Sequence, residues 1–271
     1  MTMTTTGPVE GYIRVEPHAT RDGDAVTIDA QSVYYKYVNE AIRQAIADGV
    51  TSVTLNNVNG QRYIGTGIRG KDVRITVNGT PGQDMAMLMD GPTLEVFGNA
   101  QDGVGNTMNA GTVIIHGDAG DVLGYGMRGG KVFIKGDVGY RVGIHMKAYE
   151  DLRPIMVCGG RARDFFGEYM AGGLLILLGM NSRLEGPLVG GYLGTGMHGG
   201  AIYVRGEVEP WQCGKEVGVF TANEADIADI KPVLTEYCEA LGMDLEEVLS
   251  EPFTKLVPVS HRPYGKLYTY L

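Results

Sequence analysis

The stretch GYGMRGGKVFIKGDVG, from Gly124 to Gly139, decides how this sequence folds. It opens with G-x-G-x-x-G at Gly124, Gly126 and Gly129, a spacing that allows a backbone loop to approach the pyrophosphate of a dinucleotide. In a dinucleotide site the third glycine leads into a helix, whereas here a short apolar run, KVFI, follows and ends at Gly136. The stretch therefore predicts a turn followed by a β-strand.

The same glycine spacing recurs in GTGIRG and GTGMHG, which indicates a repeat. A hydrophobic residue, usually Met, follows the second glycine or its substitute at intervals of 21, 19, 19, 19, 24 and 27 residues. These anchors are Ile68, Met89, Met108, Met127, Met146, Met170 and Met197. After each anchor comes a short run rich in Val, Ile or Leu that closes with glycine, as in TLEVFG and TVIIHG. A fixed period of about 20 residues is typical of a solenoid.

We predict a mainly β fold, a right-handed parallel β-helix of about seven coils, with an N-terminal α/β cap and C-terminal helices. Left-handed β-helix acyltransferases also repeat glycine every six residues, but they need an 18-residue coil, and here an extra residue enters each coil. Glycines at the corners are expected to have positive φ and to leave no room for a Cβ. This structural role is assigned to Gly65, Gly67, Gly105, Gly124, Gly126, Gly143, Gly167, Gly194 and Gly196.

Three segments are expected along the chain: 1–64, with a capping helix and a strand leading into the repeat, 65–206, the β-helix, and 207–271, with helices and an extended tail. DAQSVYYKYVNEAIRQAIADGV predicts the capping helix, with Asp29 as N-cap and Gly49 as its stop. Two helices are expected after 223, with Pro232 either near a first turn or at a break between shorter pieces. The tail FTKLVPVSHRPYGKLYTYL is expected to dock on the rod or on a partner.

Composition excludes several classes of protein. The 42 glycines among 271 residues, together with 44% hydrophobic residues, indicate dense turns around a real core. The net charge of −9, without a basic run, argues against nucleic-acid and anionic-membrane partners. Three separated cysteines predict no disulfide framework, zinc site or iron–sulfur cluster, and without an apolar leader or span we expect a cytoplasmic protein.

No residue pattern predicts catalysis, a bound cofactor or a metal in this chain. The histidines form no H-x-x-x-H pair, and neither His145 nor His198 has a neighbouring nucleophile, although a freestanding enzyme using one of them stays open as an alternative. Aspartates in the turns, such as Asp102 and Asp121, are expected to bond the backbone two residues on. Charged residues between 147 and 168, where the period stretches, mark either a partner-facing surface or a solvated face.

The run GNAQDGVGNTMNAGTVIIHGDAGDVLGYGMRGGKVFIKGDVGYRVGIHMK, followed by GEYMAGG, resembles the G-x-G-x-G domain at the C-terminus of the glutamate synthase large subunit, above all the archaeal type, where the domain is a separate chain. The similarity covers roughly Ile28 to Gly206, and RPYGKLY in the tail also fits. Related domains form the C-type subunit of formylmethanofuran dehydrogenase and of the formyltransferase/hydrolase complex, and a subunit of N-methylglutamate synthase.

The resemblance implies a non-catalytic β-helix that braces the domains passing ammonia from a glutaminase to a synthase site. It implies no cofactor on this chain, with FMN and iron–sulfur clusters on partner subunits, and as partners a glutaminase-type amidotransferase subunit and an FMN/iron–sulfur synthase subunit. Alternatives are the corresponding subunit of a formylmethanofuran dehydrogenase or formyltransferase/hydrolase complex and a left-handed β-helix-like acyltransferase. The candidate partner interface comprises Asn57, Asn59, Gln61, Arg62, Tyr63, Gln101, Asp102, Asn106, Asn109, Tyr140, Arg141, His145, Lys147, Arg161, Arg163, Glu168 and Tyr169.

Overall fold

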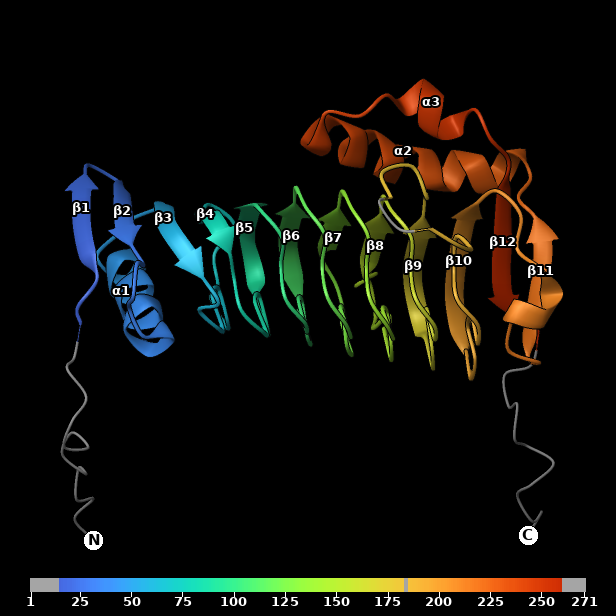
Figure 1. Cartoon of the computed structure of the whole chain (residues 1–271), viewed down its shortest axis with the longest axis horizontal. Coiled ribbons are helices and arrows are strands. Elements are labelled where there is room, and N and C mark those ends of the chain that lie inside the picture. The colour runs from blue at the N-terminus through green and yellow to red at the C-terminus, as the bar shows by residue number, and fades with distance from the viewer. Residues whose placement is uncertain (1–14, 183–184, 260–271) are drawn as a thin grey trace, which may run out of the picture.

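The computed structural model describes residues 15–182 and 185–259 and shows a mainly β protein built as a solenoid (Figure 1). Its described strands form one sheet in the order β1-β2-β3-β4-β5-β6-β7-β8-β9-β10-β12-β11. Neighbours from β2 to β10 pair in parallel, whereas β1, β12 and β11 extend the two ends by antiparallel pairing. The strands are β1 (His18–Asp22), β2 (Ala25–Asp29), β3 (Ser52–Asn59), β4 (Arg74–Thr80), β5 (Asp90–Phe97), β6 (Ala110–Ile115), β7 (Lys131–Ile134), β8 (Ile155–Cys158), β9 (Ala171–Leu177), β10 (Gly199–Arg205), β11 (Val217–Thr221) and β12 (Phe253–Pro258).

The solenoid has slightly fewer turns within the predicted repeat than the sequence suggested. Over 65–206 the strands β4 to β10 enclose about six complete turns, against the predicted seven coils. The difference arises because the coil that contains the first glycine corner begins with β3, and β3 ends before residue 65, outside the predicted repeat. One sheet runs through all three predicted segments, so the rod does not begin or end with the repeat.

Strand residues alternate between the interior of the solenoid and its outer face, and the parallel registers align equivalent positions in columns. One inward column is fully buried: Val53, Ile75, Leu94, Val113, Val132, Met156, Leu175 and Ile202. The neighbouring outward column reads Thr54, Thr76, Glu95, Ile114, Phe133, Val157, Ile176 and Tyr203. Each buried aliphatic side chain stabilises the rod by about 2 kcal/mol, so the inward columns hold the coils together.

The opposite side of the solenoid, which we call the turn face, consists of seven stacked corner turns. Each turn holds three residues of positive φ, separated by single residues. Backbone N–H groups of the first and third residues donate to the following coil, and the middle residue donates to the preceding coil, as at Gly103, Gly105 and Thr107. The triplets are Tyr63, Gly65 and Gly67; Asp84, Ala86 and Leu88; Gly103, Gly105 and Thr107; Val122, Gly124 and Gly126; Arg141, Gly143 and His145; Phe165, Gly167 and Tyr169; and Tyr192, Gly194 and Gly196.

The middle position of each triplet faces the core, and this explains the recurring glycine. A Cβ on Gly167, where φ is +74°, would lie 2.4 Å from Cδ1 of Ile202, two coils further on. A Cβ on Gly124 would lie 2.7 Å from Cε of Met156. All nine glycines to which the sequence assigned a corner role have φ between +58° and +78°. Left-handed backbone costs other residues about 1–2 kcal/mol each, which the interlocking hydrogen bonds of the turn face offset.

Aspartates beside the corner turns bond to the next coil. Oδ1 of Asp102 accepts the N–H of Asp121 at 2.9 Å, and Oδ1 of Asp121 accepts the N–H of Tyr140 at 2.8 Å. A second column repeats the arrangement from Asn99 through Asp118 and Asp137 to the N–H of Arg161. We call these columns the carboxylate ladders. The expectation that these side chains bond two residues on is wrong for them, because the stacked coil brings a donor about 19 residues away into reach.

At the N-terminal end, helix α1 (Tyr35–Ala47) packs against the first coil (Figure 1). Asp29 is not its N-cap: it ends β2, where its carboxylate accepts bonds from Asn57 Nδ2 and the Gln31 N–H, both at 3.0 Å. The bond from Asn57 contributes most to lowering the pKa of Asp29. The helix starts six residues later because Tyr34 provides the extended N-cap, and it stops before Gly49 as predicted, with φ of +86° at that glycine.

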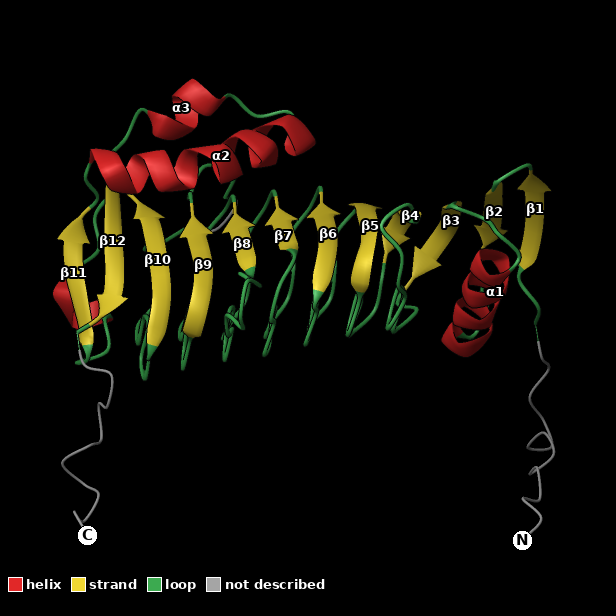
Figure 2. Cartoon of the chain, turned by 180° about the vertical axis from the view of Figure 1, so that it is seen from behind, coloured by secondary structure: helices red, strands yellow, loops and turns green. Residues whose placement is uncertain are grey.

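At the C-terminal end, helix α2 (Glu224–Leu241) lies along the rod over the outer face of the later strands, followed by α3 (Leu245–Leu249) (Figure 2). It runs unbroken through Pro232, so neither a break nor a first-turn position applies there. Its apolar side packs on outward strand residues, and tertiary burial outweighs the lost backbone bond. This second cluster includes Phe133, Val157, Ile176, Tyr203, Ile230, Leu234, Tyr237 and Leu241.

A short 3₁₀-helix, η1 (Pro210–Gln212), precedes the strands that close the rod. β12, the first part of the predicted tail, pairs with β10, and β11 pairs with the other edge of β12. The remainder of that tail, including RPYGKLY, lies outside the described residues. Among the described helices, none is long and apolar enough to cross a membrane.

Candidate partner-binding surface

Outward side chains of the last coils form two rows on the turn face. In the first row, the Arg141 guanidinium lies 4.3 Å from the ring centroid of Phe165, which stacks on Tyr192 with centroids 4.8 Å apart. In the second row, Tyr125 meets the edge of His145 at 5.8 Å, and His145 stacks on Tyr169 at 5.2 Å. We call these six residues the aromatic rows. The coil repeat stacks equivalent turn positions, which aligns Arg141 with Phe165 and Tyr192, and His145 with Tyr169, while Tyr125 reaches His145 from the neighbouring position of the preceding turn.

The aromatic rows combine exposed rings with a fixed geometry. Tyr192 is 60% exposed and Tyr125 is 45% exposed, whereas large apolar side chains in the solenoid interior are fully buried. Stacking holds each ring in place before any partner arrives, which lowers the entropy lost on binding. Tyr and Arg are enriched at the centres of protein interfaces. The rows are therefore suited to contact another protein.

An ion pair between Arg141 and Glu168 anchors the first row. The Glu168 side chain is 7% exposed and that of Arg141 is 42% exposed. A buried carboxylate needs such a partner, since an unpaired charge away from water is strongly destabilising. Arg141 thus binds Glu168 and covers Phe165 at the same time, and it links the fifth corner turn to the sixth.

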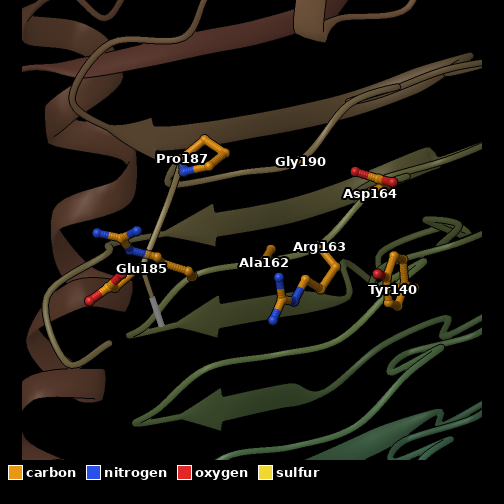
Figure 3. Close-up of a pocket in the computed structure, with 8 residues that line it drawn as sticks. Tyr140, Ala162, Arg163, Asp164, Glu185, Pro187 and Gly190 are labelled. Carbon is orange, nitrogen blue, oxygen red and sulfur yellow. The ribbon is translucent and has the colours of Figure 1, made fainter. Parts of the chain in front are cut away.

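Beside the rows, the turn face is indented. This depression, which we call the hollow, is lined by Tyr140, Arg161, Ala162, Arg163, Asp164, Glu185, Pro187 and Gly190. Figure 3 shows the side chains of Tyr140, Arg163 and Asp164 on one side of it and Glu185 and Pro187 on the other. At the hollow, the two carboxylate ladders are interrupted. Tyr140 follows Asp121 in one column, and Arg161 follows Asp137 in the other.

The structure brings together part of the predicted interface. Tyr140, Arg161 and Arg163 line the hollow, while Arg141, His145, Glu168 and Tyr169 belong to the aromatic rows or support them. Lys147 is exposed and directly follows the buried anchor Met146. These eight of the predicted residues come from two consecutive corner turns and lie close together, and their role as an interface stays a prediction.

The predicted residues nearest the N-terminus instead hold α1 against the first coil. Gln61 is buried, and its Nε2 donates to the carbonyl oxygens of Ala30 and Val33 at 2.8 and 3.2 Å. The remaining members are similarly engaged: Asn57 with Asp29, the Asn59 N–H with the Gln61 side chain, the Arg62 carbonyl with Asn39, and Tyr63 with the ring of Tyr35.

The predicted residues of the third coil also have intramolecular roles or lie apart from the rows. Asp102 belongs to a carboxylate ladder, and Asn106 Nδ2 donates to Asp84 at 3.1 Å. Gln101 is exposed. The carbonyl oxygen of Asn109 packs closely against Gly129 in the next coil, where an added Cβ would lie 2.2 Å from it. With roughly 4.8 Å between coils, the first and third turns lie about 10–25 Å from the fifth and sixth turns, which carry the other predicted residues, so the predicted residues do not form one continuous patch.

Sequence reasoning missed Tyr125, Phe165 and Tyr192, although the signal was present. Counting outward from each middle glycine places Phe165 and Tyr192 in the same column as Arg141. Tyr125 precedes the second glycine of GYGMRG, at a position that varies between the repeats. Aligning the repeats by column, as well as by glycine, would have found Phe165 and Tyr192, whereas Tyr125 lies one residue before the column of His145 and Tyr169.

Other polar groups of the described chain do not assemble into a recognisable catalytic or metal site. No group of three or more His, Cys, Asp or Glu among the described residues could hold a metal ion. His116 Nε2 lies 2.9 Å from Glu95 Oε1, and its ring stacks on Phe97. Burial raises the pKa of the Cys158 thiol and also those of Cys213 and Cys238, so none is an activated thiolate.

The fold and its G-x-G corners define the class of protein as a parallel β-solenoid with glycine-rich turns. Residues 39–260 match the GXGXG motif family, and the chain belongs to that family. The match confirms the resemblance to the glutamate synthase G-x-G-x-G domain and extends beyond Gly206. An uncharacterized protein of Methanocaldococcus jannaschii is 49% identical over 253 residues, which cover 91% of this chain and 97% of that relative.

Proposed function

We propose that this chain is a non-catalytic structural subunit of a glutamate synthase-type or N-methylglutamate synthase-type complex. It braces a glutaminase-type amidotransferase subunit against an FMN/iron–sulfur synthase subunit in the cytoplasm. FMN and the iron–sulfur clusters belong to those partners. The proposal includes a right-handed sense for the coils, the sense that parallel crossovers nearly always have.

The aromatic rows carry this proposal. Six side chains in contact along the turn face present residue types that dominate interface energetics, and Tyr192, at 60%, is more exposed than Tyr125. Family membership supports the kind of complex, because the G-x-G-x-G domain of glutamate synthase accompanies amidotransferase and flavin domains.

The first experiment is affinity purification of the tagged full chain from its own cells, with mass spectrometry of what co-purifies. We expect a glutaminase-type chain and an FMN/iron–sulfur synthase chain. Recovery with formyltransferase or molybdopterin subunits would replace this proposal with the one-carbon alternative. Recovery of the chain alone at native expression levels, or turnover by the lone chain through His145 or His198, would contradict a structural subunit.

A matched pair of variants then tests the surface. Tyr192→Ala in the aromatic rows should weaken capture of the partners at least tenfold, as removal of a central interface tyrosine does. Leu88→Ala is the control, because Leu88 is also an exposed, positive-φ member of a corner triplet but lies two coils from Tyr125 and five coils from Tyr192. Equal capture by both variants, with unchanged circular dichroism, would show that the partner binds elsewhere.

A further inference from the structure

One of the carboxylate ladders lacks a member at the hollow. In its column, Asp102, Asp121 and Asp164 each accept the N–H of the residue one coil further on. Tyr140 stands between Asp121 and Asp164 and has no carboxylate to offer. As a result, the backbone N–H of Asp164 has no hydrogen-bond acceptor among the described residues.

The second ladder ends at the same place. Its next position is Arg161, whose N–H is still capped by Asp137 at 2.7 Å. The Arg161 guanidinium donates through Nη1 to the Gly186 carbonyl, but its buried Nε has no partner in the described part of the chain. A buried donor without an acceptor costs about 1–3 kcal/mol, so this arrangement is unfavourable unless an acceptor arrives.

The other groups that line the hollow are donors from Arg163 and Tyr140 and two carboxylates, those of Asp164 and Glu185. Arg163 makes no ion pair with any residue that the structure describes, and Tyr140 contributes a half-exposed hydroxyl-bearing ring. The Oδ1 atom of Asp164 accepts the N–H of Gly191 at 2.8 Å, in the direction of the next coil. Glu185 is exposed and lies across the hollow without an ion pair to Arg161 or Arg163 (Figure 3).

We propose that the hollow is a carboxylate-binding site that receives an aspartate or glutamate side chain of the partner subunit. The incoming carboxylate takes the place that aspartates fill elsewhere in the ladder, where it accepts the Asp164 N–H and bonds to Arg161 and Arg163. Charge-assisted bonds of this kind are about twice as strong as neutral ones. The assignment deepens the proposed function and rests on it for the identity of the occupant.

The site itself is tested on the isolated full chain. The probe is N-acetylglutamic acid N-methylamide, with the corresponding glutamine derivative as control, and the readout is the ¹⁵N–¹H signal of Asp164. We expect a saturable shift with the glutamate probe alone. Tyr140→Asp, which restores the missing carboxylate, should abolish the response, whereas Tyr140→Phe should retain it. An unresponsive Asp164 signal, or equal shifts with both probes, overturns the proposal.

Two further measurements decide what occupies the site. Tyr140→Asp and Arg163→Gln should each lower the affinity for the co-purified partner at least tenfold, with Tyr140→Phe as the matched control. Unchanged affinity alongside intact probe binding would reject a partner side chain as the occupant. A large shift of the Asp164 signal in Glu185→Gln would reveal Glu185 as an internal occupant and refute the proposal. If no partner is found at all, the proposed function fails, while the probe still reports on the site.

Discussion

The two halves of the rod share one repeat but differ in what they present outward. In the first half, the outward column of the sheet carries Thr54, Thr76 and Glu95, and no helix covers these strands in the described structure. In the second half, the same column carries Phe133, Val157, Ile176 and Tyr203, and α2 packs over them (Figure 2). Inward columns are equally apolar in both halves.

The side chains on the turn face also become more aromatic from the N-terminal to the C-terminal half of the rod. Early turns present Gly103, Thr107 and members of the carboxylate ladders, whereas later turns present the aromatic rows and the hollow. The comparison teaches that inward positions and glycines specify the solenoid, while one outward position per strand or turn specifies what binds to it. Function can therefore be placed on a few coils without altering the core.

The largest effect is expected from the outward column. Phe133→Ala should lower the free energy of unfolding by about 3–5 kcal/mol, because the ring is buried between the sheet and Tyr237, which meets it at 5.7 Å. Thr76→Ala, at the same column in the uncovered half, should change it by less than about 0.5 kcal/mol. Urea unfolding of both variants measures the difference, and equal losses would remove the distinction between the halves.

A smaller effect separates the glycines of the turn face. Gly167→Ala should cost about 2–3 kcal/mol, since its Cβ would meet Ile202 in addition to the strain of a φ of +74°. Gly67→Ala should cost only about 1 kcal/mol, because φ is +64° but nothing lies within 4 Å of the added Cβ. Thermal unfolding can rank the pair, and a reversed order would mean that core contact does not select the middle glycine.

The carboxylate ladder predicts a change of about 1 kcal/mol. Asp121→Ala removes the acceptor of the Tyr140 N–H, and a net hydrogen bond of this type is worth about 1 kcal/mol. Asp121→Asn keeps an oxygen at that position and should lose less. Amide exchange at Tyr140 should accelerate in the alanine variant more than in the asparagine variant, and equal exchange in both would argue that the ladder bond is not formed.

The smallest effect concerns pH and the attachment of α2. Asp226 accepts a bond from Lys255, which is the main reason that its pKa lies below the usual value, and it also bonds the Asn223 N–H and the Tyr203 hydroxyl. Because the native pKa is lowered, the stability from Asp226 is full above about pH 3.9 and is lost as pH falls through the native value. Asp226→Asn should therefore lose stability at pH 7 and converge with the parent protein in acid. Parallel pH profiles would indicate that the carboxylate contributes nothing through its charge.

Much of the fold could be read from the sequence because it depends on period and glycine. The anchors from Ile68 to Met197 are buried, and β5 to β7 follow the predicted apolar runs. Local rules were less reliable: Asp29 resembles a helix cap in the sequence, but its bond to Asn57 comes from a strand 28 residues away. Pro232 suggests a break, yet packing of α2 on the sheet keeps the helix continuous.

Only part of the candidate surface could be predicted, because contacts between coils are not visible in the sequence. Residues from Tyr140 to Tyr169 stand out because the repeat stretches there and charges accumulate. Gln61 and Asn106 also look exposed and polar in the sequence, but their side chains bond within the chain. The missing carboxylate opposite the Asp164 N–H is invisible in a linear sequence, since it requires knowing which residues lie one coil apart.

Helix α2 also sets a limit on how the rod can change length. Its 18 residues extend about 27 Å, which corresponds to between five and six coil spacings of roughly 4.8 Å. An extra coil of about 19 residues inserted between β4 and β5 would lengthen the rod without disturbing the contacts beneath α2. The same insertion between β8 and β9 would shift half of those contacts by one spacing, so the uncovered half should accept an added coil at a lower cost in stability than the half beneath α2.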